Sequence, residues 1–198
     1  MDKPFAPACE ENKQPILEVI APRLGDARSL LEIGSCTGQH AVHFAPAMPH
    51  LTWQCSDVAP YLPGMRLWLE ETPAGNLLGP IELDVDGPWP EGPFDAVFSA
   101  NTAHIMSLDQ VRRMFLGVGR LLPTGGPFLL YGPFSDGGRH TSPSNAAFDQ
   151  SLRLRDPASG VRDLDELRAF AGDAGLTLAE DIAMPVNNRT LVWRKDAQ

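Results

Sequence analysis

Short apolar runs alternate with stretches of helical periodicity along most of the chain. Runs of strand length lie at residues 29–33, 51–57, 76–85, 94–101 and 128–131. Apolar residues recur with helical spacing behind Gly38 and over residues 10–20, 61–71, 108–121 and 164–174. This alternation is typical of an α/β domain, in which helices cover a mostly parallel sheet. Two late runs, 176–184 and 190–195, flank a turn-forming segment and predict an antiparallel C-terminal hairpin.

The first apolar run ends in a segment suited to bind a ligand. Glu32 stands at the carboxyl end of the run, and Gly34 and Gly38 allow a tight turn and close approach of a ligand. A dinucleotide loop instead reads G-x-G-x-x-G and binds pyrophosphate, which Glu32 would repel. S-adenosylmethionine (SAM) carries a cationic amino group and no phosphate. We therefore expect Glu32, Gly34, Ser35 and Gly38 to contact SAM, the alternative being an ordinary strand–turn–helix junction.

Composition and charge narrow the possible partners. The chain has 198 residues, of which 43% are hydrophobic, and it carries 16 basic against 25 acidic residues, for a net charge of -9. This balance disfavours binding to nucleic acid, which needs basic surface. The three cysteines lack metal-ligand spacing and predict reduced thiols in a cytoplasmic protein without a metal site. No apolar run has the length of a membrane span, so we expect no membrane partner.

Acidic residues at the next two strand ends are candidate nucleoside contacts. Asp57 follows Glu32 by roughly 25 positions. This spacing is near the ~20 at which a carboxylate contacts the ribose in nucleotide-binding folds. A carboxylate can accept hydrogen bonds from both ribose hydroxyls. The alternative role for Asp57 is that of an N-cap for the next helix. We expect Asp84 and the adjacent Val85 to contact adenine, with Asp86 as competitor on the same strand face. Trp89 is either a stacking partner of the adenine or part of the core.

The fourth predicted strand leads into the candidate chemistry. Ligands in open α/β sheets bind outside the carboxyl ends of the strands, so Asn101 and His104 are expected near the reacting methyl group. An imidazole, with an unperturbed pKa of ~6.5, is well suited to act as a base near neutral pH. Packing under the loop is the alternative for His104. Tyr131, at the end of the fifth strand, either lines the pocket or is buried in the sheet.

Two segments outside the sheet carry further candidates. Residues 1–9 are expected to form an irregular arm, and the following helix tolerates Pro15 only near its start. Residues 135–160 form the longest stretch that no strand of the sheet explains; they contain a short predicted helix and are expected to act on the substrate side. The arginines at 153, 155 and 162 either clamp an anion or form a solvated face with aspartate partners.

Several stretches together resemble class I SAM-dependent methyltransferases. The pattern E-x-G-x-C-x-G at residues 32–38 resembles their motif I, with Cys36 in place of the middle glycine. The whole chain resembles a small family of SAM-methyltransferase-like proteins that includes methyltransferase-like protein 26. The likeness is carried by residues 11–17, motif I, 100–105, 131–134 with 144–149, and 184–188. It implies bound SAM, and it makes Asn12, Lys13 and Asn145 candidate substrate contacts beside Tyr131.

Together these observations predict an α/β class I methyltransferase (Rossmann-like) fold. The expected sheet is doubly wound, seven-stranded and mixed, in a single domain of residues 1–198 with an N-terminal helix. The expected function is metal-independent methyl transfer from SAM to a small-molecule nucleophile. The sequence leaves open whether the methyl acceptor is an O, N or S atom, and it leaves open the oligomeric state. One alternative is a non-catalytic SAM-binding or partner-binding protein. Another is an NAD-dependent oxidoreductase, although such domains lack the C-terminal hairpin.

Overall fold

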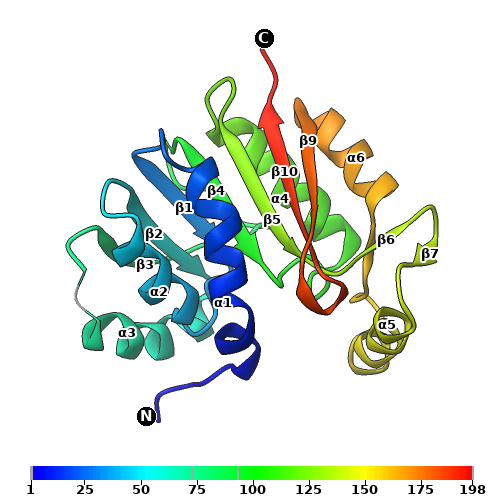
Figure 1. Ribbon diagram of the computed structural model, residues 1–198, viewed down its shortest axis with the longest axis horizontal. Coiled ribbons are helices and arrows are strands. Elements are labelled where there is room, and N and C mark those ends of the chain that lie inside the picture. The colour runs from blue at the N-terminus through cyan, green and yellow to red at the C-terminus, as the bar shows by residue number, and fades with distance from the viewer. Residues whose placement is uncertain (1, 73, 93, 198) are drawn as a thin grey trace. The chain divides into compact units, whose positions relative to one another are not determined.

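The computed structural model describes residues 2–72, 74–92 and 94–197 (Figure 1). Seven strands form a mixed sheet in the order β3-β2-β1-β4-β5-β10-β9. Neighbours among the first four are parallel, and they are β1 (Ser29–Ile33), β2 (Thr52–Asp57), β3 (Leu77–Glu82) and β4 (Ala96–Ala100). Strand β10 (Arg189–Lys195) runs antiparallel to both β5 (Pro127–Gly132) and β9 (Leu176–Ala183). The predicted fold class, including its C-terminal hairpin, is confirmed.

The chain forms two compact units, Met1–Ser99 and Ala100–Gln198, which are described in turn. The helices of the first unit are α1 (Pro7–Ile20), α2 (Gln39–Ala47) and α3 (Leu62–Glu71), with 3-10 turns at Ala21–Arg23 and Ala59–Tyr61. Helix α1 packs on α2, and α3 packs on β3. Phe44, Trp53 and Phe98 are fully buried and touch one another ring to ring. Burial on both faces explains why β1 and β4 are mostly apolar rather than alternating in character.

The N-terminal helix is longer than the sequence predicts. It begins at Pro7, so only residues 2–6 of the described arm are irregular. Proline at the first helical turn costs no hydrogen bond, because N–H groups there have no partner within the helix. Pro15 therefore lies inside the helix, and the expectation that it lies near the start is wrong. Ile16 and Ile20 are fully buried, and this burial offsets the hydrogen bond that Pro15 cannot donate.

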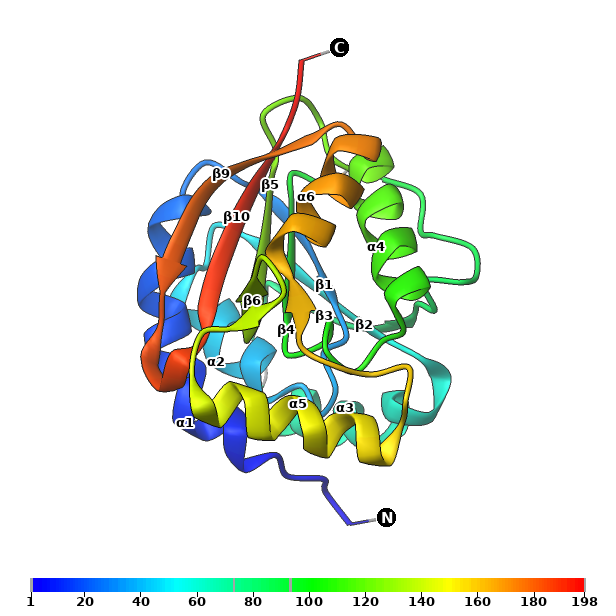
Figure 2. The same ribbon diagram turned by 90° about the vertical axis from the view of Figure 1, so that its right-hand side faces the viewer.

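The second unit contains a small sheet that the sequence did not predict. Its helices are α4 (Leu108–Leu121), α5 (Pro143–Arg155) and α6 (Leu164–Asp173), and a 3-10 turn, Pro185–Asn187, joins β9 to β10 (Figure 2). Three short strands pair in the order β7-β6-β8, namely β6 (Phe134–Asp136), β7 (Arg139–His140) and β8 (Arg162–Asp163). Residues 135–160 thus contribute to a sheet, and their helix has 13 residues rather than being short. Strands of two or three residues are too short to show a period of two.

Helix α4 has the strongest local sequence signal in this unit. Ser107 and Gln110 form a capping box at its start, and its predicted apolar stripe is buried at Val111, Met114, Phe115 and Val118. No helix within the described residues combines the length and the apolar character that a membrane span requires.

Candidate functional site

The loop behind β1 keeps a glycine-type backbone even where the sequence has a cysteine. Gly34, Cys36 and Gly38 have φ angles of 72°, 52° and 84°. Alternate residues of the loop are thus left-handed, a conformation that costs a residue with a Cβ roughly 1–2 kcal/mol. Cys36 occupies the middle position at this cost, and its side chain is exposed. The departure from the motif I pattern therefore changes the side chain and not the path of the backbone.

Gly38 also has a packing role. A Cβ at this residue would lie 2.9 Å from Cγ of Met65 and 3.0 Å from Cδ1 of Leu69, both on α3. The absence of a side chain therefore lets α3 approach the loop closely. The sequence predicts a tight turn and close approach of a ligand at this glycine, but it does not predict packing against a helix.

Glu32 is a fully enclosed carboxyl group beside this loop. It is 1% exposed, and its Oε2 accepts from Nε1 of Trp53 and from the hydroxyl of Ser35, each at 2.8 Å. Burial raises its pKa to about 7, although both donors act in the opposite direction. Glu32 is therefore poised between its two protonation states at neutral pH. A bound cation would favour the carboxylate.

Asp57 closes the loop from the neighbouring strand. Its Oδ2 accepts from the backbone N–H of Cys36 at 2.7 Å, and its Oδ1 accepts from that of Val58 at 2.8 Å. Burial raises the pKa of this carboxyl, and the two N–H donors oppose the rise. A carboxylate has about four acceptor positions, so Asp57 keeps capacity to accept from further donors. The N-cap role considered for Asp57 is replaced by a bridge between two loops.

The structure places Asp84 differently from its prediction. Strand β3 ends at Glu82, so Asp84 and Asp86 do not alternate on a strand face. Oδ1 of Asp84 instead accepts from the N–H of Asp86 at 2.9 Å, which forms a side-chain turn that ends the extended segment. Asp84 is exposed and Val85 is buried. The indole of Trp89 is half-buried and donates to the carbonyl of Val85 at 3.4 Å.

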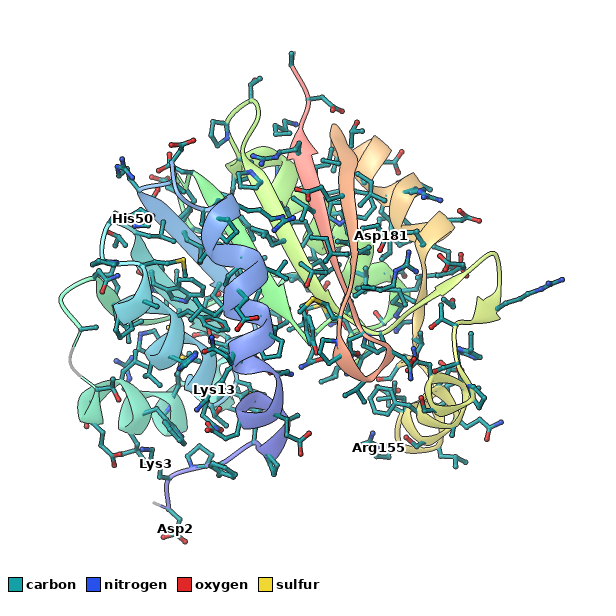
Figure 3. All side chains as sticks on the ribbon, in the orientation of Figure 1. Asp2, Lys3, Lys13, His50, Arg155 and Asp181 are labelled. Atoms are coloured by element: carbon teal, nitrogen blue, oxygen red, sulfur yellow. The ribbon has the colours of Figure 1, made fainter. Side chains whose placement is uncertain are left out.

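Asn12 and Lys13 lie in α1, and each is paired within the first unit. Oδ1 of Asn12 is 2.7 Å from Nε2 of His40, and Lys13, labelled in Figure 3, forms an ion pair with Glu10. Glu10 also accepts from Nε2 of Gln39 at 2.7 Å. These contacts fasten α1 to the residues that directly follow the motif I loop.

His40 is a buried imidazole to which the sequence assigned no role. It is 6% exposed and stacks on Phe44 with ring centroids 5.2 Å apart. Burial is the main cause that lowers its pKa to about 4, so the ring is neutral at physiological pH. The one signal available in the sequence was its position two residues behind Gly38.

In the second unit, His104 is also a buried, neutral imidazole. It is 7% exposed, and the edge of Phe148 packs against it with ring centroids 5.2 Å apart. Burial, and then the charges of Arg162 and Arg155, lower its pKa to about 4. His104 is therefore unprotonated at neutral pH, as a base must be, but it is weaker than an imidazole in water.

The remaining candidate residues of this unit form hydrogen bonds with other residues of the same unit. Asn101 has a φ of 59° and its N–H donates to the carbonyl of Tyr131 at 2.9 Å. Tyr131 is 2% exposed, and its hydroxyl accepts from Nδ2 of Asn188 at 3.0 Å. The side-chain amide of Asn145 donates to Oγ1 of Thr141 and to the carbonyl of Asn187. Burial of Tyr131 in the sheet matches the second of the two interpretations given for it.

The arginines at 153, 155 and 162 each have a hydrogen-bond partner within the second unit. Nε of Arg153 donates to Asp149 and Nε of Arg155 donates to the carbonyl of Ser151. Arg162 is 5% exposed and donates to backbone carbonyls. The interpretation as a solvated face with aspartate partners holds for Arg153 only.

The structure thus brings the candidates together in two groups. Glu32, Ser35 and Asp57 lie at the carboxyl ends of adjacent parallel strands, with the left-handed loop between them. In the second unit, Tyr131 is linked to Asn101 through the backbone. The contacts of Asp84 and Lys13 stay within their own turn and helix, whereas Asn145 of α5 binds the turn between β9 and β10.

Several solved structures that resemble this chain are described as methyltransferases. An O-methyltransferase family protein from Burkholderia thailandensis matches with a TM-score of 0.84 and 17% identity over 96% of this chain and 58% of that one. Human N-acetylserotonin methyltransferase in complex with SAM matches with a TM-score of 0.79 and 15% identity over 96% and 53% of the two chains. Mitomycin 7-O-methyltransferase MmcR matches with a TM-score of 0.81 and 18% identity over 93% of this chain and 54% of that one. The chain spans little more than half the length of these proteins, and at such identities the likeness establishes the fold.

The family follows from the sequence itself. A family model described as a protein of unknown function, DUF938, matches residues 3–195. The chain belongs to this family, and its fold is the Rossmann-like fold of the class I methyltransferases.

Proposed function

We propose that this protein is a SAM-dependent methyltransferase that acts on a small molecule. The observation that carries the proposal is the left-handed loop at residues 34–38, held between the carboxyl groups of Glu32 and Asp57. Two buried carboxyl groups are unfavourable neighbours for a pyrophosphate. They are suitable acceptors for the donors of SAM, which are an ammonium group and two ribose hydroxyls. The fold neighbours support the same class of cofactor, since one of them was solved with SAM.

In this proposal all the cofactor contacts except Asn101 belong to the first unit. Glu32 attracts the methionine ammonium, directly or through water, and Gly34, Ser35 and Gly38 line the methionine portion. Asp57 accepts from the ribose hydroxyls, Asp84 and Val85 contact the adenine, and Asn101 completes the cofactor contacts. SAM, when bound, supplies a methyl group on a sulfonium for in-line displacement by a nucleophile.

We propose that the following residues contact the methyl acceptor: His104, Asn12, Lys13, Tyr131 and Asn145. His104, being neutral, accepts the proton that the acceptor loses, or it orients the acceptor by a hydrogen bond. Alignment of donor and nucleophile supplies the rest of the catalysis. We further propose that the chain is a single, metal-independent domain located in the cytoplasm and related to the family of methyltransferase-like protein 26. Its acidic net charge and the length of its apolar runs support the absence of nucleic-acid and membrane partners.

A second candidate function is SAM binding without catalysis. It is favoured by the low pKa of His104 and by the hydrogen bonds of Tyr131 and Asn145 to their own chain. A protein of this kind binds SAM and releases no S-adenosylhomocysteine with any acceptor.

Calorimetric titration with SAM, S-adenosylhomocysteine and NAD tests the proposal. We expect binding of both adenosyl ligands with micromolar affinity and no heat with NAD. Release of S-adenosylhomocysteine over a panel of phenols, thiols and amines then separates the enzyme from the non-catalytic binder. Absence of binding for both adenosyl ligands would refute the proposal, and binding of NAD alone would favour an oxidoreductase.

A further inference from the structure

The loop that carries His104 is bound at four consecutive carbonyl groups by one short segment. We call residues 103–106 the His104 loop and residues 158–162 the linker, which follows α5 and leads to α6 (Figure 2). The hydrogen bonds run from Arg162 Nε to Ala103 O at 3.0 Å, Gly160 N to His104 O at 2.9 Å, Ser159 Oγ to Ile105 O at 2.7 Å, and from Arg162 to Met106 O. The linker therefore follows the backbone of the His104 loop residue by residue.

Arg162 makes the two outermost of these contacts. Its guanidinium donates to the carbonyls of Ala103 and Met106, on either side of His104, and also to the carbonyl of Ala158 at 2.7 Å. The side chain is 5% exposed. Burying a cation is costly unless its donors are satisfied, and the planar fork of arginine can satisfy several acceptors at fixed angles. The contact consequently requires one particular conformation of the His104 loop.

The linker is in turn fixed to α5. Oδ1 of Asp149, a buried residue of α5, accepts from the N–H of Val161 at 2.7 Å. Gly160 has a φ of 156°, and a Cβ there would lie 2.6 Å from a guanidinium nitrogen of Arg153. A side chain at residue 160 would require the guanidinium of Arg153 and the carboxylate of Asp149 to move. Since Phe148 of α5 also packs on the imidazole, α5, the linker and the His104 loop form one connected assembly.

We propose that Arg162 is a positioning residue for His104, which sets the place and orientation of the imidazole by binding the loop on both sides of it. This inference rests on the proposed function, in which His104 contacts the methyl acceptor. The charged groups whose fields act on His104 are Arg162 and Arg155. Arg162 thereby both holds the backbone around His104 and disfavours a proton on its ring.

Two substitutions separate these contributions. Arg162→Lys keeps the charge but replaces the fork by one ammonium group, which cannot reach both flanking carbonyls in the same geometry. Arg162→Gln also removes the charge. The control is Arg155→Gln, which removes a nearby charge from an exposed position on α5 whose guanidinium bonds within its own helix (Figure 3).

The readouts are the imidazole resonances of His104 in NMR spectra and hydrogen exchange of the Gly160 amide. We expect both Arg162 variants to shift the resonances and to speed exchange of that amide by about tenfold, because its acceptor is the carbonyl of His104. Arg162→Gln should also raise the pKa of His104 by about one unit. Arg155→Gln should leave the Gly160 exchange rate at its wild-type value. It should shift the imidazole resonances less than either Arg162 variant, because Arg155 is the weaker of the two charges acting on His104.

The outcomes distinguish this inference from the proposed function. Wild-type resonances and Gly160 exchange in Arg162→Lys would overturn the positioning role. If neither Arg162 variant folds, Ser159→Ala removes a single bond to the loop and is judged by the same two readouts. Failure of the wild-type protein to bind SAM would refute the methyltransferase proposal while the NMR result stands. With a methyl acceptor in hand, Arg162→Lys should lower kcat and leave SAM affinity unchanged.

Discussion

The indole N–H of Trp53 donates to Oε2 of Glu32 at 2.8 Å, and both residues are enclosed in the first unit. The donor lies on β2 and the acceptor on β1, so the contact links adjacent strands ahead of the loop that we propose to bind SAM. The contact holds a carboxyl group where burial favours its protonated form. Because the folded protein favours the protonated form of Glu32 more than the unfolded chain does, the free energy of unfolding depends on pH.

Glu32→Gln should remove this pH dependence. A pKa raised from 4.5 to about 7 stabilises the folded protein below pH 4.5 relative to higher pH, and this stability is lost as pH rises to about 7. The change amounts to roughly 3 kcal/mol, at ~1.4 kcal/mol for each unit of pKa. Urea unfolding of both proteins at pH 5, 6, 7 and 8 measures it as a difference. Parallel curves for wild type and variant would contradict the assignment.

Asp57→Ala should weaken both the fold and SAM binding. The substitution leaves the N–H groups of Cys36 and Val58 without their acceptor, which should cost about 2 kcal/mol of unfolding free energy. Loss of the ribose contacts should lower SAM affinity by about tenfold or more in calorimetry. Asp57→Asn keeps one acceptor oxygen and should lose less stability. Unchanged SAM affinity in the alanine variant would remove Asp57 from the cofactor site.

Cys36→Gly should stabilise the protein. Cys36 has a φ of 52°, and glycine adopts this conformation without the steric penalty of a Cβ. We expect a gain of about 1 kcal/mol after allowing for the greater entropy of glycine in the unfolded chain. Cys36→Ser, which has the same backbone restriction, should leave stability unchanged and serves as the control. A glycine variant less stable than wild type would mean that the cysteine side chain stabilises the loop.

Asn12 and His40 should be energetically coupled. Their side chains are 2.7 Å apart and join α1 to α2. A double-mutant cycle with Asn12→Ala and His40→Ala, followed by chemical unfolding, should give a coupling of about 1 kcal/mol. Strictly additive effects would show that the pair does not fasten α1.

His104→Ala should separate cofactor binding from turnover. SAM affinity should remain at the wild-type value, whereas release of S-adenosylhomocysteine with an accepted substrate should fall by roughly 10² or more. Because the pKa of His104 is about 4, its titration should not appear in the rate profile between pH 6 and 8. Turnover equal to wild type would exclude His104 from the chemistry.

Much of the fold was readable from the sequence, because buried parallel strands are continuous apolar runs. Strands β1, β2 and β4 and the hairpin β9–β10 lie close to their predicted ranges. The errors among the strands arise where the local sequence signal is shorter than one period of the pattern. The turn formed by Asp84 ends β3 early, and the strands β6, β7 and β8 have two or three residues each.

The motif I loop illustrates how local the readable part of the site is. The spacing of Glu32, Gly34 and Gly38 is encoded within seven residues, and the structure preserves its backbone even with Cys36 in the middle. Asp57 was found because an acidic residue at the next strand end has a regular place in such folds. By contrast, the partner of His40 is Asn12, which lies 28 positions away in the sequence. No periodic pattern predicts a contact between them.

The sequence by itself therefore determined the class of fold and the path of the loop between Glu32 and Gly38, since both depend on local periodicity and on glycine positions. The protonation states of Glu32 and His104 followed only from their burial in the folded protein. Arg162 is the clearest case: it binds the carbonyl of Ala103 across 59 positions of sequence. Burial and hydrogen bonding between distant residues arise only when the chain folds, so a lone arginine in the sequence carries no sign of them.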